Sequence, residues 1–172
     1  LPGVKEPKRA RDLIKETALL EFKMLDEDNQ QKLDLPARIP KDKEADVLKQ
    51  VEGKLPEGDQ ILFERAFEKD SGREYRIPYL VKKRVMLTGD VLSDARVSIG
   101  QFNDPYVSIT FDAKGGREFE RITGDNIKKR MAVVLDNTIY SAPVIQDRIT
   151  GGRAQITGTF SMQEANDLAI VL

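Results

Sequence analysis

The segment AVVLDNTIYSAPVI, residues 132–145, constrains the fold of this chain more than any other stretch. Its two apolar runs flank Asp136-Asn137, and two residues of this kind between strand-like runs are typical of a tight β-hairpin. The second run contains Pro143, which has no backbone N–H and cannot complete the hydrogen bonds of a central strand. The sequence therefore predicts a hairpin whose second strand is not fully paired.

Two other segments predict strands from their pattern. Residues 18–25 alternate apolar and charged side chains, with Leu20, Phe22 and Met24 on one side, as in a half-buried strand. Residues 59–85 predict a second, highly charged hairpin that turns at Asp70-Ser71-Gly72 and carries Pro78 on an edge strand.

The order of the remaining patterns indicates the fold class. Strands are also expected at 96–100, 106–111, 131–136, 138–145 and 153–157, and helices at 5–16, at 43–53 ending at Gly53, in the middle of 113–130, and from Ser161 onward. We therefore expect an α+β domain with a mixed or antiparallel β-sheet, helices packed on one face, and the charged hairpin as an excursion.

Composition excludes several functions. The net charge is −1, with 28 basic and 29 acidic residues, so no strong field favours nucleic acid or an anionic membrane. The chain has no Cys and no His, which removes the common zinc ligands and the Ser-His and Cys-His nucleophile pairs. We expect a folded monomer without metal or cofactor and without catalytic residues.

Three motifs have weaker functional interpretations. Glycine pairs precede Arg117 and Arg153, but neither stretch matches a phosphate-binding fingerprint, and turns are the simpler account. The repeated Leu/Ile-Thr-Gly tripeptides have no fixed period and also fit turns. Asp90, Asp94 and Asp136 lie where solvated turn carboxylates are common, so a carboxylate-dependent hydrolase is disfavoured.

The two ends of the chain suggest a fragment. The sequence starts with Leu1 instead of Met and stops at AIVL (169–172) without a C-cap glycine. No apolar run is long enough to cross a bilayer, and no signal peptide is present. We therefore expect a piece of a longer protein.

Several segments resemble the SecD family, the bacterial inner-membrane subunits that work with SecF beside the Sec translocon. The resemblance covers most of the chain in order and is carried by LPGVKEPKRARDLIKETALLEFK (1–23), LTGDVLSDARV (87–97), PYVSITFDAKGGREFERIT (105–123), NIKKRMAVVLDNTIYSAPVIQDRITGGRAQITG (126–158) and EANDLAIVL (164–172). Only residues 26–80 are not distinctive.

The resemblance implies a position and a partner set. Residues 1–17 are similar to the last strand end and helix of a ferredoxin-like base, and residues 18–172 to the head subdomain of a large extracytoplasmic, periplasmic loop. Implied partners are an unfolded secretory preprotein, SecF and the SecYEG translocon. The family's proton-conducting residues lie in membrane helices outside this fragment, so the membrane is met only through those helices.

A domain that handles unfolded chains needs accessible apolar surface. The candidates for preprotein contact are Phe102, Tyr106, Tyr140, Pro143, Val144 and Ile145. Pro143 would either keep an unpaired edge from pairing permanently or mark a bulge or strand end. Val144 and Ile145, taken singly, fit a core position better than a surface position.

The alternative family-level hypothesis is the porter domain of a related RND efflux transporter. Such a domain should enclose an aromatic pocket, whereas aromatic residues make up 6% of this chain and Trp is absent. The composition therefore favours protein export over small-molecule efflux.

We predict that residues 26–80 are more mobile than residues 86–172. Polar loops, several prolines and a charged hairpin leave few apolar contacts to bury there. Hydrogen exchange measures this directly, and protection of residues 26–58 equal to that of residues 131–157 would contradict the prediction.

Overall fold

The computed structural model describes residues 20–68, 70–157 and Ala165. In chain order its elements are β1 (Leu20–Met24), α2 (Glu27–Gln30), β2 (Ile39–Pro40), the 3-10 turn η1 (Lys41–Lys43), α3 (Glu44–Gln50), β3 (Asp59–Phe67), β4 (Glu74–Lys82), β5 (Leu87–Thr88), the 3-10 turn η2 (Gly89–Val91), β6 (Leu92–Ile99), β7 (Pro105–Phe111), α4 (Ala113–Asp125), β8 (Met131–Leu135), β9 (Thr138–Ser141) and β10 (Arg153–Ile156). The α+β class is confirmed.

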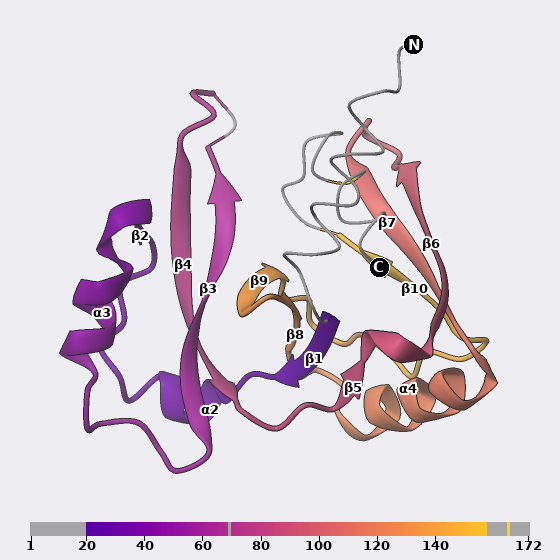
Figure 1. Ribbon diagram of the computed structural model, residues 1–172, viewed down its shortest axis with the longest axis horizontal. Helices are drawn as coiled ribbons and strands as arrows, with labels where there is room; N and C mark the ends of the chain where they lie inside the picture. The colour runs from indigo at the N-terminus through magenta and orange to yellow at the C-terminus, as the bar shows by residue number, and fades with distance from the viewer. Residues whose placement is uncertain (1–19, 69, 158–164, 166–172) are drawn as a thin grey trace.

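The strands form two sheets rather than one. The larger sheet has the order β2-β4-β3-β9-β8-β1-β5 and is mixed, because β3 and β9 run parallel while its other pairs are antiparallel. The smaller sheet, β10-β7-β6, is antiparallel. The β3–β4 and β6–β7 hairpins rise on opposite sides of the molecule in Figure 1, with β1, β8 and β9 between them.

The larger sheet curls until it meets itself. Just past the end of β1, Leu25 forms an antiparallel bridge with Val81 of β4, and the backbone N–H of Asp26 donates to the carbonyl of Leu80 at 2.9 Å. The strands β4, β3, β9, β8 and β1 therefore enclose an inner face. Its apolar core consists of Leu25, Leu62, Tyr79, Val81, Ala132, Val134, Ile139 and Ala142.

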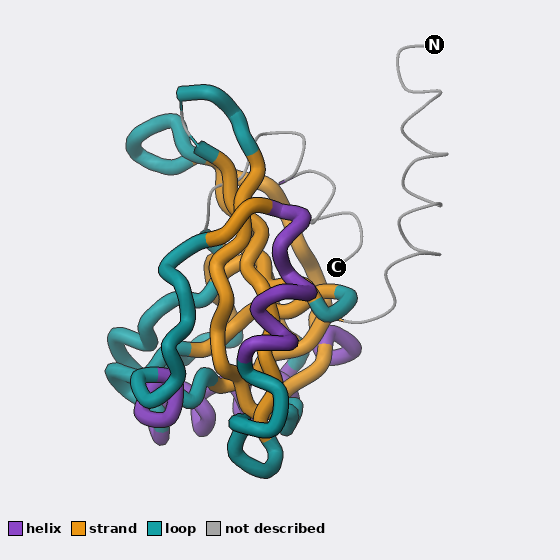
Figure 2. The backbone as a smooth tube through the Cα atoms, turned by 90° about the vertical axis from the view of Figure 1, so that its left-hand side faces the viewer, coloured by secondary structure: helices purple, strands orange, loops and turns teal. Residues whose placement is uncertain are grey.

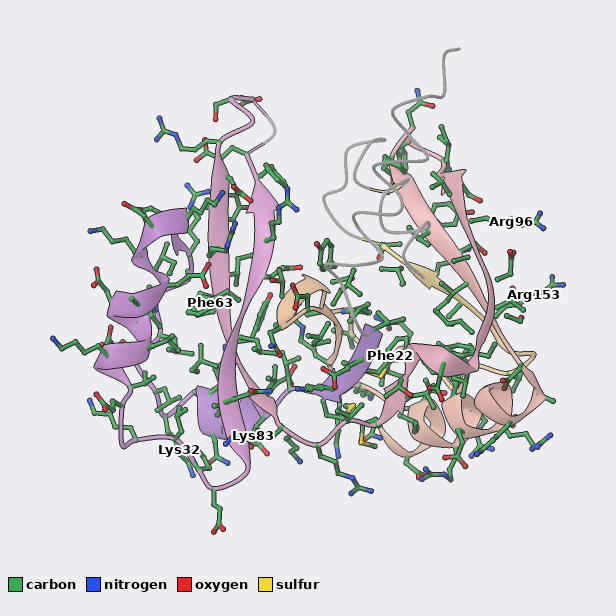
Figure 3. All side chains as sticks on the ribbon, in the orientation of Figure 1. Phe22, Lys32, Phe63, Lys83, Arg96 and Arg153 are labelled. Carbon is green, nitrogen blue, oxygen red and sulfur yellow. The ribbon has the colours of Figure 1, made fainter. Side chains whose placement is uncertain are left out.

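The outer face of the same sheet carries the helices. At the β3–β4 end, Val47 of α3 and Val51, which directly follows α3, share a core with Phe63 and Leu80. Figure 2 shows α3 lying across the strands, and Figure 3 shows Phe63 between them. At the β1–β8 end, α4 and the smaller sheet cover the outer face through a larger core. Helices pack on one face of the sheet, as the sequence predicts.

Three phenylalanines hold the larger core together. Phe22 of β1 lies 6.1 Å from Phe111 of β7 and 5.7 Å from Phe119 of α4, measured between ring centroids. Phe111 and Phe119 are 4.6 Å apart, and all three pairs are tilted. Because each ring comes from a different element, this cluster joins the two sheets and the longest described helix.

The local sequence patterns are realised closely. The strand in 18–25 is β1, and the charged hairpin is β3–β4 with Gly72 in its turn at φ 71°. Pro78 was expected on an edge strand, but its strand β4 lies between β3 and the short β2. Both Asp136 and Asn137 have positive φ, 52° and 59°, which is the backbone of the type I′ turn that joins β8 to β9. The expected helix at 5–16 and the helix starting at Ser161 lie outside the described residues.

The polar loops expected within residues 26–80 need one correction. Residues 26–41 contain α2 and β2, and Asp26 caps α2 by accepting a hydrogen bond from the N–H of Asn29 at 3.2 Å. The four-residue helix was missed because it has no apolar face, and its cap and its place against β4 define it instead. The buried side chains of Ile39 and Val47 also tie this part of the chain to the outer face of the sheet.

None of the helices in the described part of the chain combines the length and the apolar character that a membrane span requires.

We predict that Phe22→Ala lowers the free energy of unfolding by about 3–5 kcal/mol, because the change empties the centre of the aromatic cluster. For a domain of this size the midpoint of thermal unfolding should fall by about 10 °C. Phe102→Ala is the matched control, since its ring is 85% exposed and its removal should change stability little. Equal losses in the two variants would contradict a cluster-centred core.

Candidate functional site

The turn between β6 and β7 carries the most exposed aromatic ring in the described part of the chain. Phe102 is 85% exposed, and Ile99 at the end of β6 is 53% exposed. Asp104 holds the turn by accepting a hydrogen bond from the N–H of Phe102 at 3.3 Å, while its carbonyl accepts from Gly100 at 2.8 Å. Tyr106 of β7 pairs with Ser98 of β6 and is half-buried beside this turn.

The other candidates lie on and after β9. Tyr140 is the extra residue of a β-bulge, because Val134 pairs with Ile139 while Val133 pairs with Ser141. Its ring packs partly against the larger core. This side chain lies on the opposite face of the sheet from its neighbour Ile139, which belongs to the inner core.

Pro143 does not border an unpaired edge. Its carbonyl accepts a hydrogen bond from the N–H of Met131 at 3.1 Å, so the proline is in register with β8. The nitrogen and the carbonyl of one residue in an extended chain point to the same side, so the Pro143 nitrogen also faces β8. Of the two interpretations of Pro143, the geometry agrees with a strand end: β9 stops at Ser141 because the ladder loses one bond here.

Val144 and Ile145 have different environments. Val144 is 42% exposed and forms an isolated bridge with Arg130, whereas Ile145 is 4% exposed and belongs to the larger core. The backbone N–H of Ile145 donates a hydrogen bond to the carbonyl of Lys129, and its carbonyl accepts one from the N–H of Lys128. Ile145 is therefore a core residue and does not form part of an accessible surface.

The structure thus divides the sequence candidates into two groups. Phe102 and Tyr106 lie at the free end of the β6–β7 hairpin, while Tyr140 and Val144 belong to the central β8–β9 region (Figure 1). Sequence reasoning did not single out Ile99, although its place at the strand end beside Phe102 is a usable signal.

A polar network crosses the inner face of the larger sheet. The Tyr79 hydroxyl donates to a Glu64 carboxylate oxygen at 3.3 Å and accepts from Arg130 Nη2 at 3.1 Å. Arg130 also donates from Nε to the carbonyl of Ala142 at 2.9 Å, and its guanidinium lies 4.9 Å from the centre of the Tyr79 ring. Burial raises the pKa of Glu64, and the Tyr79 hydrogen bond and the Arg130 charge oppose this rise.

A cavity of about 380 Å³ lies beside this network. Its lining mixes leucines with polar and charged side chains and comes from α2, the residues on either side of it, and the residue before β8. The lining residues are Leu25, Glu27, Gln30, Gln31, Leu33, Leu35 and Arg130. The lining has no aromatic ring, in contrast to the enclosed aromatic pocket that a small-molecule porter would require.

The two glycine pairs singled out in the sequence meet in space. A Cβ on Gly116 would lie 3.2 Å from the Cα of Gly152, and a Cβ on Gly115 would lie 2.6 Å from Val91. Gly152 also accepts, through its carbonyl, a 2.7 Å hydrogen bond from Phe111. Close packing therefore explains Gly115, Gly116 and Gly152, and the positive φ of Gly151, 81°, explains the fourth glycine, without a ligand.

A carboxyl pair lies where the curled sheet closes. Asp59 at the start of β3 is 8% exposed, and its Oδ2 atom is buried without a hydrogen-bond partner. Burial, followed by the hydrogen bond and charge of Asp26, raises the pKa of Asp59 to about 6. The hydrogen bond from Asn29 lowers the pKa of Asp26. Within the described residues, no three acidic side chains gather closely enough to hold a metal ion.

Sequence comparisons identify the proteins that this chain resembles. Residues 62–172 match the family described as the SecDF P1 head subdomain, and residues 1–27 match the N-terminal part of the P1 domain of protein translocase subunit SecDF. The protein translocase subunit SecD of Magnetococcus marinus is 42% identical over 172 residues, covering 100% of this chain and 30% of that protein. SecD of Calditerrivibrio nitroreducens is 47% identical over 174 residues, covering 100% of this chain and 31% of that protein.

Solved structures agree with these matches. A structure of SecDF, described as a membrane component that enhances protein export, is 32% identical with a TM-score of 0.60, over 99% of this chain and 70% of that chain. A crystal structure of SecDF in a super-membrane-facing form has a TM-score of 0.61 at 31% identity, over 98% of this chain and 20% of that chain.

We predict that Asp59→Asn makes the domain more stable above pH 6 and removes one component of its pH dependence. The pKa of Asp59 is raised from 3.8 to about 6, so the folded state holds this proton more tightly than the unfolded state does. The stability of the parent should therefore fall by about 1–2 kcal/mol as the pH rises from about 4 to about 6 and then level off. Urea unfolding across this range measures the effect.

The exposed neighbour Glu57 provides the control. Glu57→Gln should leave the stability profile parallel to that of the parent between pH 4 and pH 8. A Asp59→Asn profile that also stays parallel to the parent would show that Asp59 carries no such proton.

Proposed function

This chain belongs to the SecD family of protein translocase subunits, and from that premise we propose that it is the extracytoplasmic domain that engages a preprotein during export. The observation that carries the proposal is the exposed apolar group at the end of the β6–β7 hairpin, Ile99 and Phe102. Exposed side chains on a short turn offer contact without enclosure, so an unfolded chain can bind and leave quickly.

The proposal extends to the assembly around the domain. The chain spans about 30% of the length of the curated relatives that it matches. In this proposal, the rest of the whole protein contributes membrane helices and further domains. We place this domain on the periplasmic side of the bacterial inner membrane, beside SecF and the SecYEG translocon. Residues 1–17 would belong to the base and residues 18–172 to the head, and rigid-body motion between them would couple proton flow in the membrane helices to outward movement of the preprotein.

The domain's own contribution is binding rather than chemistry. The relatives are named as translocase subunits. Tight binding would oppose release, because affinity for related partners is set mainly by the dissociation rate. Weak contacts to apolar side chains and to the backbone suit a partner whose sequence changes with every exported protein.

The efflux-porter alternative has less support. The cavity beside Arg130 has no aromatic residue in its lining, and the matches that identify the family are to SecD and SecDF. We therefore favour a polypeptide over a small apolar molecule as the substrate class.

We predict that Phe102→Asp combined with Tyr140→Asp in the full-length protein reduces export and crosslinking to a stalled secretory chain together. A loss of about 1 kcal/mol of contact free energy corresponds to an approximately fivefold loss of crosslinked product. Site-specific photocrosslinking in inverted membranes and a parallel export assay provide the two readouts.

Folding has to be checked in the same experiment, because Tyr140 packs partly against the larger core. Phe102→Asp alone separates the two effects, since that ring is 85% exposed. Leu48→Asp on α3 is the control for an exposed apolar side chain elsewhere, as Leu48 is 46% exposed. Normal folding with unchanged export in Phe102→Asp would exclude the end of the β6–β7 hairpin, and the same result in the double variant would exclude Tyr140 as well.

A further inference from the structure

The outer edge of β4 is closed along its length. The N–H of Glu68 donates to the carbonyl of Arg73, so Arg73 faces β3, and every second residue of β4 after it faces β3 as well. The residues between them direct their backbone groups away from β3, and they include Arg76, Pro78 and Leu80. Arg76 is paired with Ile39 of β2, and Pro78 has no N–H to offer. The N–H of Leu80 donates to the Gln30 side chain at 2.9 Å, and its carbonyl accepts from Asp26.

The outer edge of β6 has none of these devices. Gly100 donates to the carbonyl of Asp104 at 2.8 Å, which fixes the alternation of the β6–β7 ladder. The N–H and C=O groups of Ala95, Val97 and Ile99 therefore point away from β7. Among the described residues β6 pairs with β7 alone, and it is the outermost strand of its sheet in Figure 1.

The side chains on β6 leave this edge approachable. Asp94 and Arg96 form an ion pair at 2.8 Å on the solvent face, and Arg96 points away from the sheet in Figure 3. The other face of β6 carries Ala95, Val97 and Ile99, of which the first two pack partly against the larger core. No proline interrupts the strand. The face that carries the side chains of Ala95, Val97 and Ile99 has no charged side chain.

Natural proteins usually protect a long edge strand from pairing with another chain. Among the described residues, β4 has three such protections, whereas the protections on β6, which is eight residues long, are the bulge at its start and the Asp94–Arg96 pair. The unpaired backbone groups of Ala95, Val97 and Ile99 can therefore take a further strand, and the partner that forms main-chain hydrogen bonds at any sequence is an extended polypeptide.

We infer that the preprotein binds by adding an extended segment as a further strand along β6, hydrogen-bonded to Ala95, Val97 and Ile99. The inference rests on the proposed function and specifies its mode. Backbone pairing is independent of the preprotein's sequence, and Ile99 and Phe102 at the end of the strand provide apolar contacts for alternate side chains.

Val97→Pro tests this mode in the full-length protein. The substitution removes an N–H that makes no bond to β7, and proline is tolerated on an edge strand in that orientation. Val97→Ile is the matched control, because it keeps the N–H and a β-branched side chain. A photoreactive residue replaces Ser98, on the solvent face beside the proposed strand, and the probe is a secretory preprotein stalled in the translocon.

The expected result is a loss of about fivefold in crosslinking from position 98 in Val97→Pro, as one hydrogen bond and the strand geometry are lost, with no change in Val97→Ile. Unchanged crosslinking from position 98 in Val97→Pro would overturn backbone pairing. Crosslinking from position 102 but not from position 98 would also overturn it, while the proposed function would stand. Absence of crosslinks from every position on the domain would remove the proposed function itself.

A second measurement covers the case in which Val97→Pro fails to fold. Amide hydrogen exchange of the parent full-length protein is compared with and without a reduced, carboxymethylated and therefore permanently unfolded polypeptide. The amides of Ala95, Val97 and Ile99 should become protected, whereas those of Arg96 and Ser98 are already bonded to β7 and should change little. Protection confined to other segments, or to none, would overturn the inference.

Discussion

The contact among Phe22, Phe111 and Phe119 is the interaction on which the rest of the structure depends. It places one ring from each sheet and one from α4 in a single core, and tilted aromatic pairs add specific geometry to the area that they bury. Together with the other apolar residues of the larger core, it fixes the β6–β7 hairpin relative to the curled sheet. The exposed end of that hairpin can project into solvent because its base is held so firmly.

Closure of the larger sheet is the second constraint. When Leu25 reaches Val81, the backbone of β4 gains its last partners, and the edge that could pair with another molecule disappears. The same closure buries polar groups, which then need partners: Tyr79 and Arg130 bond to each other, and Glu64 bonds to Tyr79. Asp59 at the seam has one carboxylate oxygen, Oδ2, without a partner, and burial together with the neighbouring Asp26 raises the pKa of Asp59 to about 6.

These two constraints leave an asymmetric molecule. One hairpin is covered by α3 and has its edge closed, while the other is anchored at its base and keeps an open edge and an exposed turn. A protein that holds changing, unfolded chains needs a rigid support and an undemanding contact surface. Under the proposed function, this arrangement separates the two requirements, because the buried clusters supply stability while backbone groups and a few apolar side chains would supply the contact.

Local signals in the sequence determined the α+β class, the strand in 18–25, both hairpins and the Asp136-Asn137 turn, because each depends on neighbours within a few residues. The family was likewise readable from several ordered motifs. The ring of Phe102, a candidate from residue type, is exposed, and Ile145 packs in the core, which residue type had favoured for that position. Only the tertiary structure decided that the sheet closes on itself, that the Pro143 nitrogen faces β8, and that β6 is an outer strand which, among the described residues, pairs with β7 alone. Those features depend on pairing between distant segments, where a shift of one residue reverses which backbone groups and side chains face outward.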